Sequence, residues 1–157
     1  MSELAAKVIR TLTERSLSLA AAESLTGGLI GATLTDVPGA SKVYVGGTIA
    51  YATPMKTALL GIEWEVIRQH TVVSERVALE MAIGLQERTD ADWVIAVTGV
   101  AGPDPQDGHD PGEVWICVLG PRVPSTPQFQ QIERFSFEGD REAVRRQTVE
   151  ASFGMLL

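Results

Sequence analysis

The chain alternates short apolar runs with segments of helical periodicity, and this alternation restricts its possible folds more than any other feature. Leu4, Val8 and Leu12 recur at the spacing that places apolar side chains on one face of a helix. The apolar run at 17–22 then has the length and character of a buried strand. Strands separated by helices predict an α/β sandwich, with helices on both faces of a mainly parallel sheet.

The same patterns predict the remaining elements. Thr53 is expected to cap a helix in which Pro54 is the first residue. The wholly apolar run 93–97 is expected at the centre of the sheet, and the more polar run 129–137 nearer an edge. Loops join the last three predicted strands, so we expect antiparallel pairing there and a mixed sheet. The predicted strands are 17–22, 45–52, 93–97, 113–119 and 129–137, and the predicted helices are 4–14, 29–34, 53–60, 63–70, 75–85 and 139–157.

The length and composition suit one domain spanning residues 1–157. A chain of 157 residues with 45% hydrophobic and 21% charged side chains has enough apolar material for a core. Its net charge of −7 argues against general binding to DNA, RNA or anionic membranes, since such binding needs clustered cations. The single cysteine, Cys117, excludes an intrachain disulfide and a cysteine-rich zinc site, and we expect it to be buried.

The N-terminal residues lack the basic start and long apolar core of a signal peptide. No stretch approaches the run of apolar residues that a transmembrane helix needs. We therefore expect a soluble cytoplasmic protein with no membrane association.

The segment 23–28 is the first candidate for chemistry. It follows a predicted strand and begins a predicted helix, where exposed N–H groups favour an anion or an oxyanion. Gly27 and Gly28 allow a ligand to approach the backbone, and Ser24 stands where a nucleophile would. The phosphate-loop, G-x-G-x-x-G and G-x-S-x-G patterns are missing. On these residues alone, a tight turn capped by Ser24 is the favoured alternative.

A nucleophilic serine needs a base, and Lys56 is a candidate. A desolvated lysine near a helix N-terminus is held towards its neutral form and can replace histidine in this role. Tyr51, at the end of the preceding predicted strand, could relay the proton or orient the lysine. Judged by residue type alone, Lys56 would be an exposed helix lysine and Tyr51 an aromatic at the core edge. His70 is expected at a helix C-terminus and His109 in solvent, neither pointing clearly at Ser24.

Thr98 forms the third candidate, together with the glycines that follow it. It comes at the end of an apolar strand, where open α/β sheets gather their ligand contacts. Gly99 and Gly102 would let a ligand approach the backbone, whereas the alternative is an ordinary exit loop. The long loop 98–111 is of a kind that is usually functional or mobile.

The acidic and basic residues of the second half support weaker interpretations. Asp104, Asp107 and Asp110 do not have the calcium-loop spacing, so we expect a solvated loop and no metal site. Arg141 and Arg145 share one face of the last predicted helix and could clamp a phosphate. Ordinary surface pairing with neighbouring carboxylates explains that arginine cluster at least as well.

Taken together, several of these segments resemble the C-terminal domain family of CinA, the competence- and damage-inducible protein, whose members include nicotinamide mononucleotide deamidases. The resemblance covers almost the whole chain and is more specific than any single motif. It implies a three-layer α/β/α sandwich with a mixed, mainly parallel five-stranded sheet. The matching segments are 22–28, 35–41, 51–56, 72–75, 97–103, 111–115 and 137–141.

The resemblance also implies an amidohydrolase that converts nicotinamide mononucleotide and water to nicotinic acid mononucleotide and ammonia, without a metal or cofactor. It assigns the nucleophile to Ser24, the base to Lys56 and an auxiliary role to Tyr51. The implied partners are a small nucleotide and a second copy of the chain, as a homodimer, but not nucleic acid. The expected substrate contacts are Thr26, Gly27, Gly28, Thr98, Gly99, Gly102, Arg141 and Arg145.

The chain departs from the family pattern beside the implied site. Ala52 and Thr53 replace the usual serine and asparagine, Pro54 follows them, and 104–108 replaces a glycine-rich loop. These differences motivate a second hypothesis, a nucleotide-binding or regulatory module linked to competence or DNA damage that has lost turnover. A third hypothesis, a partner-binding domain of DNA uptake or repair, is suggested only by the family name.

Overall fold

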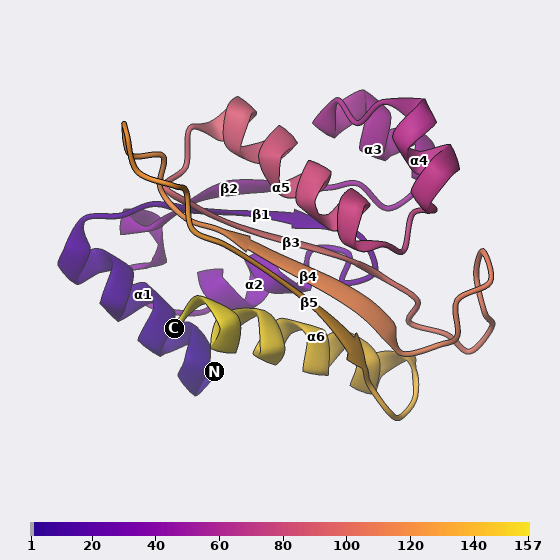
Figure 1. The fold of residues 1–157 in the computed structure, drawn as a ribbon. Coiled ribbons are helices and arrows are strands. Elements are labelled where there is room, and N and C mark those ends of the chain that lie inside the picture. Colours follow the sequence, from indigo (N-terminus) through magenta and orange to yellow (C-terminus); the bar gives the residue numbers. More distant parts are fainter. Residues whose placement is uncertain (1) are drawn as a thin grey trace.

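The computed structural model describes residues 2–157 and shows a five-stranded sheet between two layers of helices. Helices α1, α2 and α6 cover one face of the sheet, and α3, α4 and α5 cover the other (Figure 1). The strands are β1 (Leu19–Glu23), β2 (Tyr44–Ile49), β3 (Trp93–Gly99), β4 (Glu113–Leu119) and β5 (Gln130–Ser136). The helices are α1 (Glu3–Arg15), α2 (Leu29–Thr35), α3 (Thr53–Leu60), α4 (Trp64–His70), α5 (Glu75–Thr89) and α6 (Arg141–Leu156), with a 3₁₀ turn at Ala40–Lys42.

The strand order β2-β1-β3-β4-β5 confirms the mixed sheet expected from the sequence. β1 pairs in parallel with both β2 and β3, whereas β3–β4 and β4–β5 pair antiparallel. β4 therefore runs against the other strands. The apolar β3 lies at the centre and the polar β5 at an edge, both as predicted. The chain leaves β1 towards β2 on one side and later returns to β3 on the other, so the sheet reverses its order between β1 and β3.

Each central strand contributes to two cores, which explains why it is apolar throughout. In β1, Leu19 and Ala21 pack with α1, α2 and α6, while Ala20 and Ala22 pack with α3 and α5. A strand buried on both faces has no solvent side for polar residues. Cys117 lies on β4 with no exposed surface, as expected, and burial raises the pKa of its thiol to about 12. The thiol is therefore protonated and unreactive near neutral pH.

The helix ends agree with the sequence in most places. Ser74 caps α5 by accepting a hydrogen bond from the Val77 N–H, and Asp140 caps α6 in the same way. The prediction for α3 is wrong by one residue: Ala52 is the N-cap and Thr53 the first helical residue. No side chain caps this helix end, and proline suits either of its first positions because the N–H groups there have no partner within the helix. Within residues 2–157, no helix is both long enough and apolar enough to cross a membrane.

We predict that Gly84 is required for the packing of α5 on α3. A Cβ at Gly84 would collide with the main-chain carbonyl of Leu60. Gly84→Ala should therefore lower the free energy of unfolding by about 2 kcal/mol in urea denaturation. Gly154→Ala in α6 is the matched control, because the added Cβ would meet nothing within 4 Å. This substitution should raise the free energy of unfolding by about 0.5–1 kcal/mol. A Gly84→Ala variant as stable as the wild type would contradict this packing.

Candidate active site

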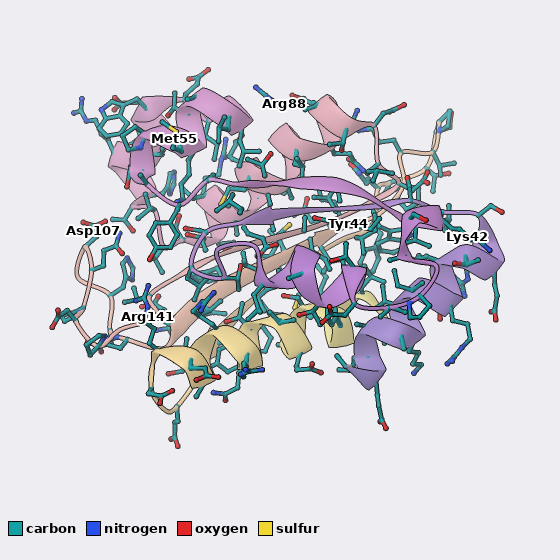
Figure 2. The ribbon with its side chains drawn as sticks, turned by 180° about the vertical axis from the view of Figure 1, so that it is seen from behind. Lys42, Tyr44, Met55, Arg88, Asp107 and Arg141 are labelled. Atoms are coloured by element: carbon teal, nitrogen blue, oxygen red, sulfur yellow. The ribbon has the colours of Figure 1, made fainter. Side chains whose placement is uncertain are left out.

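A cavity of about 660 Å³ opens where β1 and β3 end and holds many of the candidate residues. This place is the carboxyl edge of the sheet at its order reversal, where open α/β sheets bind ligands. Residues after β1, β2 and β3 line it, and the loop before β4 and the start of α6 complete it. Figure 2 shows Arg141 of α6 and Asp107 of that loop at the same end of the molecule. The candidate residues among its lining are Ser24, Tyr51, Lys56, Thr98, Gly99, Gly102 and Arg141.

Ser24 and Lys56 form a buried pair on the wall of this cavity. The Lys56 Nζ lies 3.0 Å from the Ser24 Oγ, although the two residues are 32 positions apart in the chain. Lys56 is only 2% exposed, and Ser24 is 7% exposed. Lys56 is thus not the exposed helix lysine that its residue type alone would favour. The first turn of α3 points its side chain inward, across the end of β1.

The surroundings of Lys56 suit both of its protonation states. Its Nζ donates to the carbonyl oxygen of Ala50 at 2.8 Å and lies 3.4 Å from that of Tyr51. The ammonium form can thus donate three hydrogen bonds, one of them to Ser24. A neutral amine can keep both carbonyls and turn its lone pair towards the Ser24 hydroxyl. Burial lowers the pKa of Lys56 from 10.5 to about 8, which brings the neutral form within reach near physiological pH.

Tyr51 lies at the rim of the cavity rather than in the core. Its side chain is 54% exposed, and its hydroxyl accepts a hydrogen bond from the Arg141 Nη2 at 2.7 Å. Arg141 also donates through Nη1 to the carbonyl of Gly102 at 2.7 Å. The guanidinium therefore joins the segment after β2 to the loop after β3, on the solvent side of the cavity. The hydrogen bond from Lys56 to Tyr51 goes to the main-chain carbonyl, whereas the Tyr51 hydroxyl is bonded to Arg141.

The turn that carries Ser24 is held from behind by two charged side chains. The Glu23 carboxylate, 2% exposed, accepts hydrogen bonds from the N–H groups of Gly28, Ile30 and Gly31 at 2.9–3.0 Å. The acid thus fills the N-terminus of α2, which its partial positive charge favours. The sequence analysis included Glu23 in the candidate segment 23–28 but gave its carboxylate no role. A carboxylate directly before a glycine-rich helix start is the signal that could have revealed it.

Arg145 supports the other side of the same turn. Its guanidinium donates to the carbonyls of Leu25 and Thr26 at 3.1 and 2.8 Å. Arg145 is absent from the cavity lining, as are Thr26, Gly27 and Gly28. Thr26 is fully buried, and its hydroxyl has no hydrogen-bond partner among the described residues. The structure therefore separates the expected substrate contacts into a group at the cavity and a group behind the Ser24 turn.

The β3 side of the cavity is also tied down internally. The Thr98 hydroxyl, expected to meet substrate, donates to the carbonyl of Val72 at 2.6 Å. At Gly99, a Cβ would press against Val114 and the Glu113 carbonyl of the neighbouring strand. Close approach of β4 is thus enough to explain a glycine there. Among residues 2–157, no group of three His, Cys, Asp or Glu side chains is arranged to hold a metal ion.

The two histidines differ in their surroundings. His70 is the last residue of α4, as predicted, and is exposed. The prediction that His109 lies free in solvent is wrong, because its ring sits between Thr71 and Glu113 and is hydrogen-bonded to both. The interpretation of the 104–110 loop as simply solvated is therefore incomplete, since one of its side chains anchors it to the domain.

Comparison with known proteins shows one consistent relationship. The family model for the CinA C-terminal domain matches residues 1–157. A CinA-like protein of Myxococcus xanthus is 42% identical over 142 residues, which cover 90% of this chain and 32% of that protein. A CinA-like protein of Desulfotalea psychrophila is 40% identical over 148 residues, 94% of this chain and 34% of that protein. The chain thus spans about a third of the length of these relatives.

Solved structures agree with the sequence relatives. The competence/damage inducible protein CihA from Agrobacterium tumefaciens has a TM-score of 0.91 and 31% identity, over 98% of this chain and 92% of that one. A competence damage-inducible protein A from Klebsiella pneumoniae has a TM-score of 0.90 and 32% identity, with the same coverage. Fold, sequence and family model coincide, and the chain belongs to the CinA C-terminal domain family.

Proposed function

We propose that this chain hydrolyses the carboxamide of nicotinamide mononucleotide to nicotinic acid mononucleotide and ammonia, with Ser24 as nucleophile and Lys56 as base. The observation that carries the proposal is the 3.0 Å contact between the Lys56 Nζ and the Ser24 Oγ at the wall of a cavity. A general base must lie within this reach of the proton it removes. The family resemblance of the segments 22–28 and 51–56 supports the same assignment.

In the first half of the reaction, neutral Lys56 takes the proton of Ser24 as Oγ bonds to the carboxamide carbon. The carbonyl electron pair moves to oxygen and forms an oxyanion. When this pair returns, the C–N bond breaks, and the leaving nitrogen takes the proton from the Lys56 ammonium and departs as ammonia. The product of this half is an ester between Ser24 and the nicotinic acid nucleotide.

The second half repeats these transfers with water. Lys56, neutral again, takes a proton from water as the water oxygen bonds to the ester carbon. The C–O bond to Ser24 breaks, and Oγ recovers its proton from Lys56. Nicotinic acid mononucleotide leaves, and its new carboxyl group loses its remaining proton to solvent. One lysine thus serves as base and acid in both halves, which a pKa of about 8 allows.

The oxyanion needs a donor, and the Leu25 N–H is the best placed candidate. Leu25 follows the nucleophile directly and lines the cavity. The amides of Gly27 and Gly28, expected in this role, donate instead to the Ser24 carbonyl at 3.0 Å and to the Glu23 carboxylate at 3.0 Å. The N–H of the residue after a nucleophile serves the same purpose in other hydrolases.

Arg141 is the residue that we propose for the substrate phosphate. It lines the cavity at its open rim, whereas Lys56, the other lysine or arginine of the lining, is buried beside Ser24. A guanidinium can meet a phosphate with two parallel hydrogen bonds. A nucleotide with its carboxamide at Ser24 would then extend outward towards Arg141. This arrangement supplies local positive charge in a protein of net charge −7.

The proposal is tested by incubating the purified chain with nicotinamide mononucleotide. We expect equal amounts of ammonia and nicotinic acid mononucleotide, measured by an enzyme-coupled ammonia assay and by mass spectrometry of the nucleotide. Absence of both products would reject the hydrolase. If the nucleotide then still raised the melting temperature of the chain, this result would favour the second candidate, a binding or regulatory module. The altered residues Ala52 and Thr53 in the cavity wall are the observation that motivates this candidate.

A further inference from the structure

The cavity has one side built from two segments that are far apart in the chain. Residues 101–106 of the loop between β3 and β4 contribute the outer part of this side. Val72 and Val73, between α4 and α5, contribute the inner part. Neither segment belongs to the elements that carry Ser24 and Lys56. The shape of the cavity therefore depends on how these two segments are held together.

His109 joins them. Its Nε2 lies 2.8 Å from the Thr71 Oγ1, and its Nδ1 lies 2.9 Å from the Glu113 Oε2. A neutral ring that donates from Nδ1 to the carboxylate accepts at Nε2 from the hydroxyl, so both nitrogens are satisfied. Thr71 directly precedes the cavity residues Val72 and Val73. The ring thus attaches the loop to the inner segment and to the first residue of β4.

Main-chain hydrogen bonds also connect the loop between β3 and β4 to His109 itself. Gln106 and His109 exchange two hydrogen bonds, at 3.0 and 2.8 Å, and form a small bridge at the loop tip. Gln106 is itself a cavity residue, so the ring of His109 holds a piece of backbone that includes the cavity wall. Beyond the bridge, the Gly112 N–H donates to the Val100 carbonyl at 2.7 Å.

Both partners of His109 are themselves held in place. Burial alone would raise the pKa of Glu113, but the hydrogen bonds from Arg134 and His109 lower it overall, so the acid stays ionised. Thr71 has φ 64° and ψ 160°, a conformation that residues other than glycine rarely adopt. Its carbonyl accepts from the Ser74 hydroxyl at 2.9 Å, and its N–H donates to Ile67 at 2.9 Å. A strained threonine persists only where its surroundings fix it, and His109 is one of these contacts.

We infer that His109 is a positioning residue, which holds the loop 100–112 against Thr71 and thereby sets the shape of the substrate cavity. This inference rests on the proposed function for its effect on substrate. The loop faces the part of the nucleotide that extends away from Ser24, so loosening it should weaken binding more than chemistry. The histidine is therefore needed for the affinity of the site although it touches neither Ser24 nor Lys56.

The first test measures the loop without reference to activity. Hydrogen exchange followed by mass spectrometry should show at least tenfold faster exchange at the main-chain amides of positions 106 and 109 in His109→Ala than in the wild type. Lys7→Ala is the control, because Lys7 is exposed on α1 and does not line this cavity, and it should leave these amides unchanged. His109→Gln offers one donor and one acceptor and should restore part of the protection.

The second test separates binding from chemistry. For ammonia release from nicotinamide mononucleotide, His109→Ala should raise KM about tenfold and change kcat by less than about threefold, and His109→Gln should fall between it and the wild type. Unchanged exchange in His109→Ala would reject the link itself. Faster exchange with an unchanged KM would reject the role in substrate positioning. A wild type without activity would reject the proposed function. The nucleotide affinities of the wild type and His109→Ala, measured by thermal shift, would then decide whether the loop shapes a binding cavity, and equal affinities would reject it.

Discussion

Replacing Ser24 by alanine is expected to reduce ammonia release from nicotinamide mononucleotide by roughly 10⁴-fold or more. The reason is chemical: among residues 2–157, Ser24 supplies the one hydroxyl or thiol that is hydrogen-bonded to the Lys56 amine, at 3.0 Å. Direct attack by water would have to replace the covalent route, and this typically loses most of the acceleration. The measurement is the initial rate at saturating nucleotide, compared between the two proteins at equal concentration.

The Ser24→Ala chain should keep its fold and its ability to bind the nucleotide. It loses one hydrogen bond, so its melting temperature should change by only a few degrees. The nucleotide should still raise that temperature, because Arg141 and the loop 101–106 are untouched. Ser41→Ala is the matched control, since Ser41 is exposed on the 3₁₀ turn. Equal rates for Ser24→Ala and the wild type would eliminate Ser24 as nucleophile, whatever else the chain does.

Replacing Lys56 by methionine is expected to lower kcat by about 10³-fold, the usual size of a lost general base. The wild-type rate should rise with pH, because only the neutral amine can take the serine proton, and it should level off above the pKa of about 8. The remaining activity of Lys56→Met should not follow this curve. Lys42→Met is the control, because Lys42 lies far from Arg141 in Figure 2 and is exposed. A wild-type rate that falls as pH rises from 6 to 9 would contradict the role of a neutral lysine.

The same lysine should make the stability of the protein depend on pH. Its pKa is about 8 in the folded state and 10.5 in a model peptide, so between these values the unfolded chain binds more protons. The free energy of unfolding should therefore rise with pH across this window, by up to about 3 kcal/mol from this group. Below pH 8 the folded state bears the full cost of the buried ammonium. Urea denaturation at pH 7.5 and 10 should show the rise in the wild type and a smaller one in Lys56→Met.

The fold was predictable because its signals are local. The apolar runs of β1 and β3 follow from burial on both faces, and Ser74 and Asp140 cap helices by contacts within a few residues. β5 is polar because it lies at the sheet edge, where solvent is accessible. The start of α3 was misplaced by one residue because neither Ala52 nor Thr53 supplies a capping side chain.

The site was less predictable because its contacts are long-range. Lys56 lies in a helix whose other residues show no special pattern. Its burial is explained by three oxygen acceptors, the Ser24 hydroxyl and two main-chain carbonyls, which the fold brings to its amine. The residues alone offered Lys56 only as a candidate base for Ser24, and the resemblance then assigned that role to it. His109 was expected in solvent because its partner Thr71 is 38 residues away, and no local rule joins them. Glu23 was overlooked because its bonds go to main-chain groups, which residue types do not reveal.

Glu23 has a consequence for the way a ligand can lie in this protein. Its carboxylate and the Thr26 carbonyl together accept the N–H groups of Gly28, Leu29, Ile30 and Gly31, so the first turn of α2 has none left for a second anion. Many α/β proteins hold a nucleotide by its phosphate at such a helix end. Here the Glu23 carboxylate already occupies that end, so the phosphate of a ligand in the cavity has to be held elsewhere, and Arg141 at the rim is the residue proposed for it. An acid that does not line the cavity thus removes one possible phosphate site beside it.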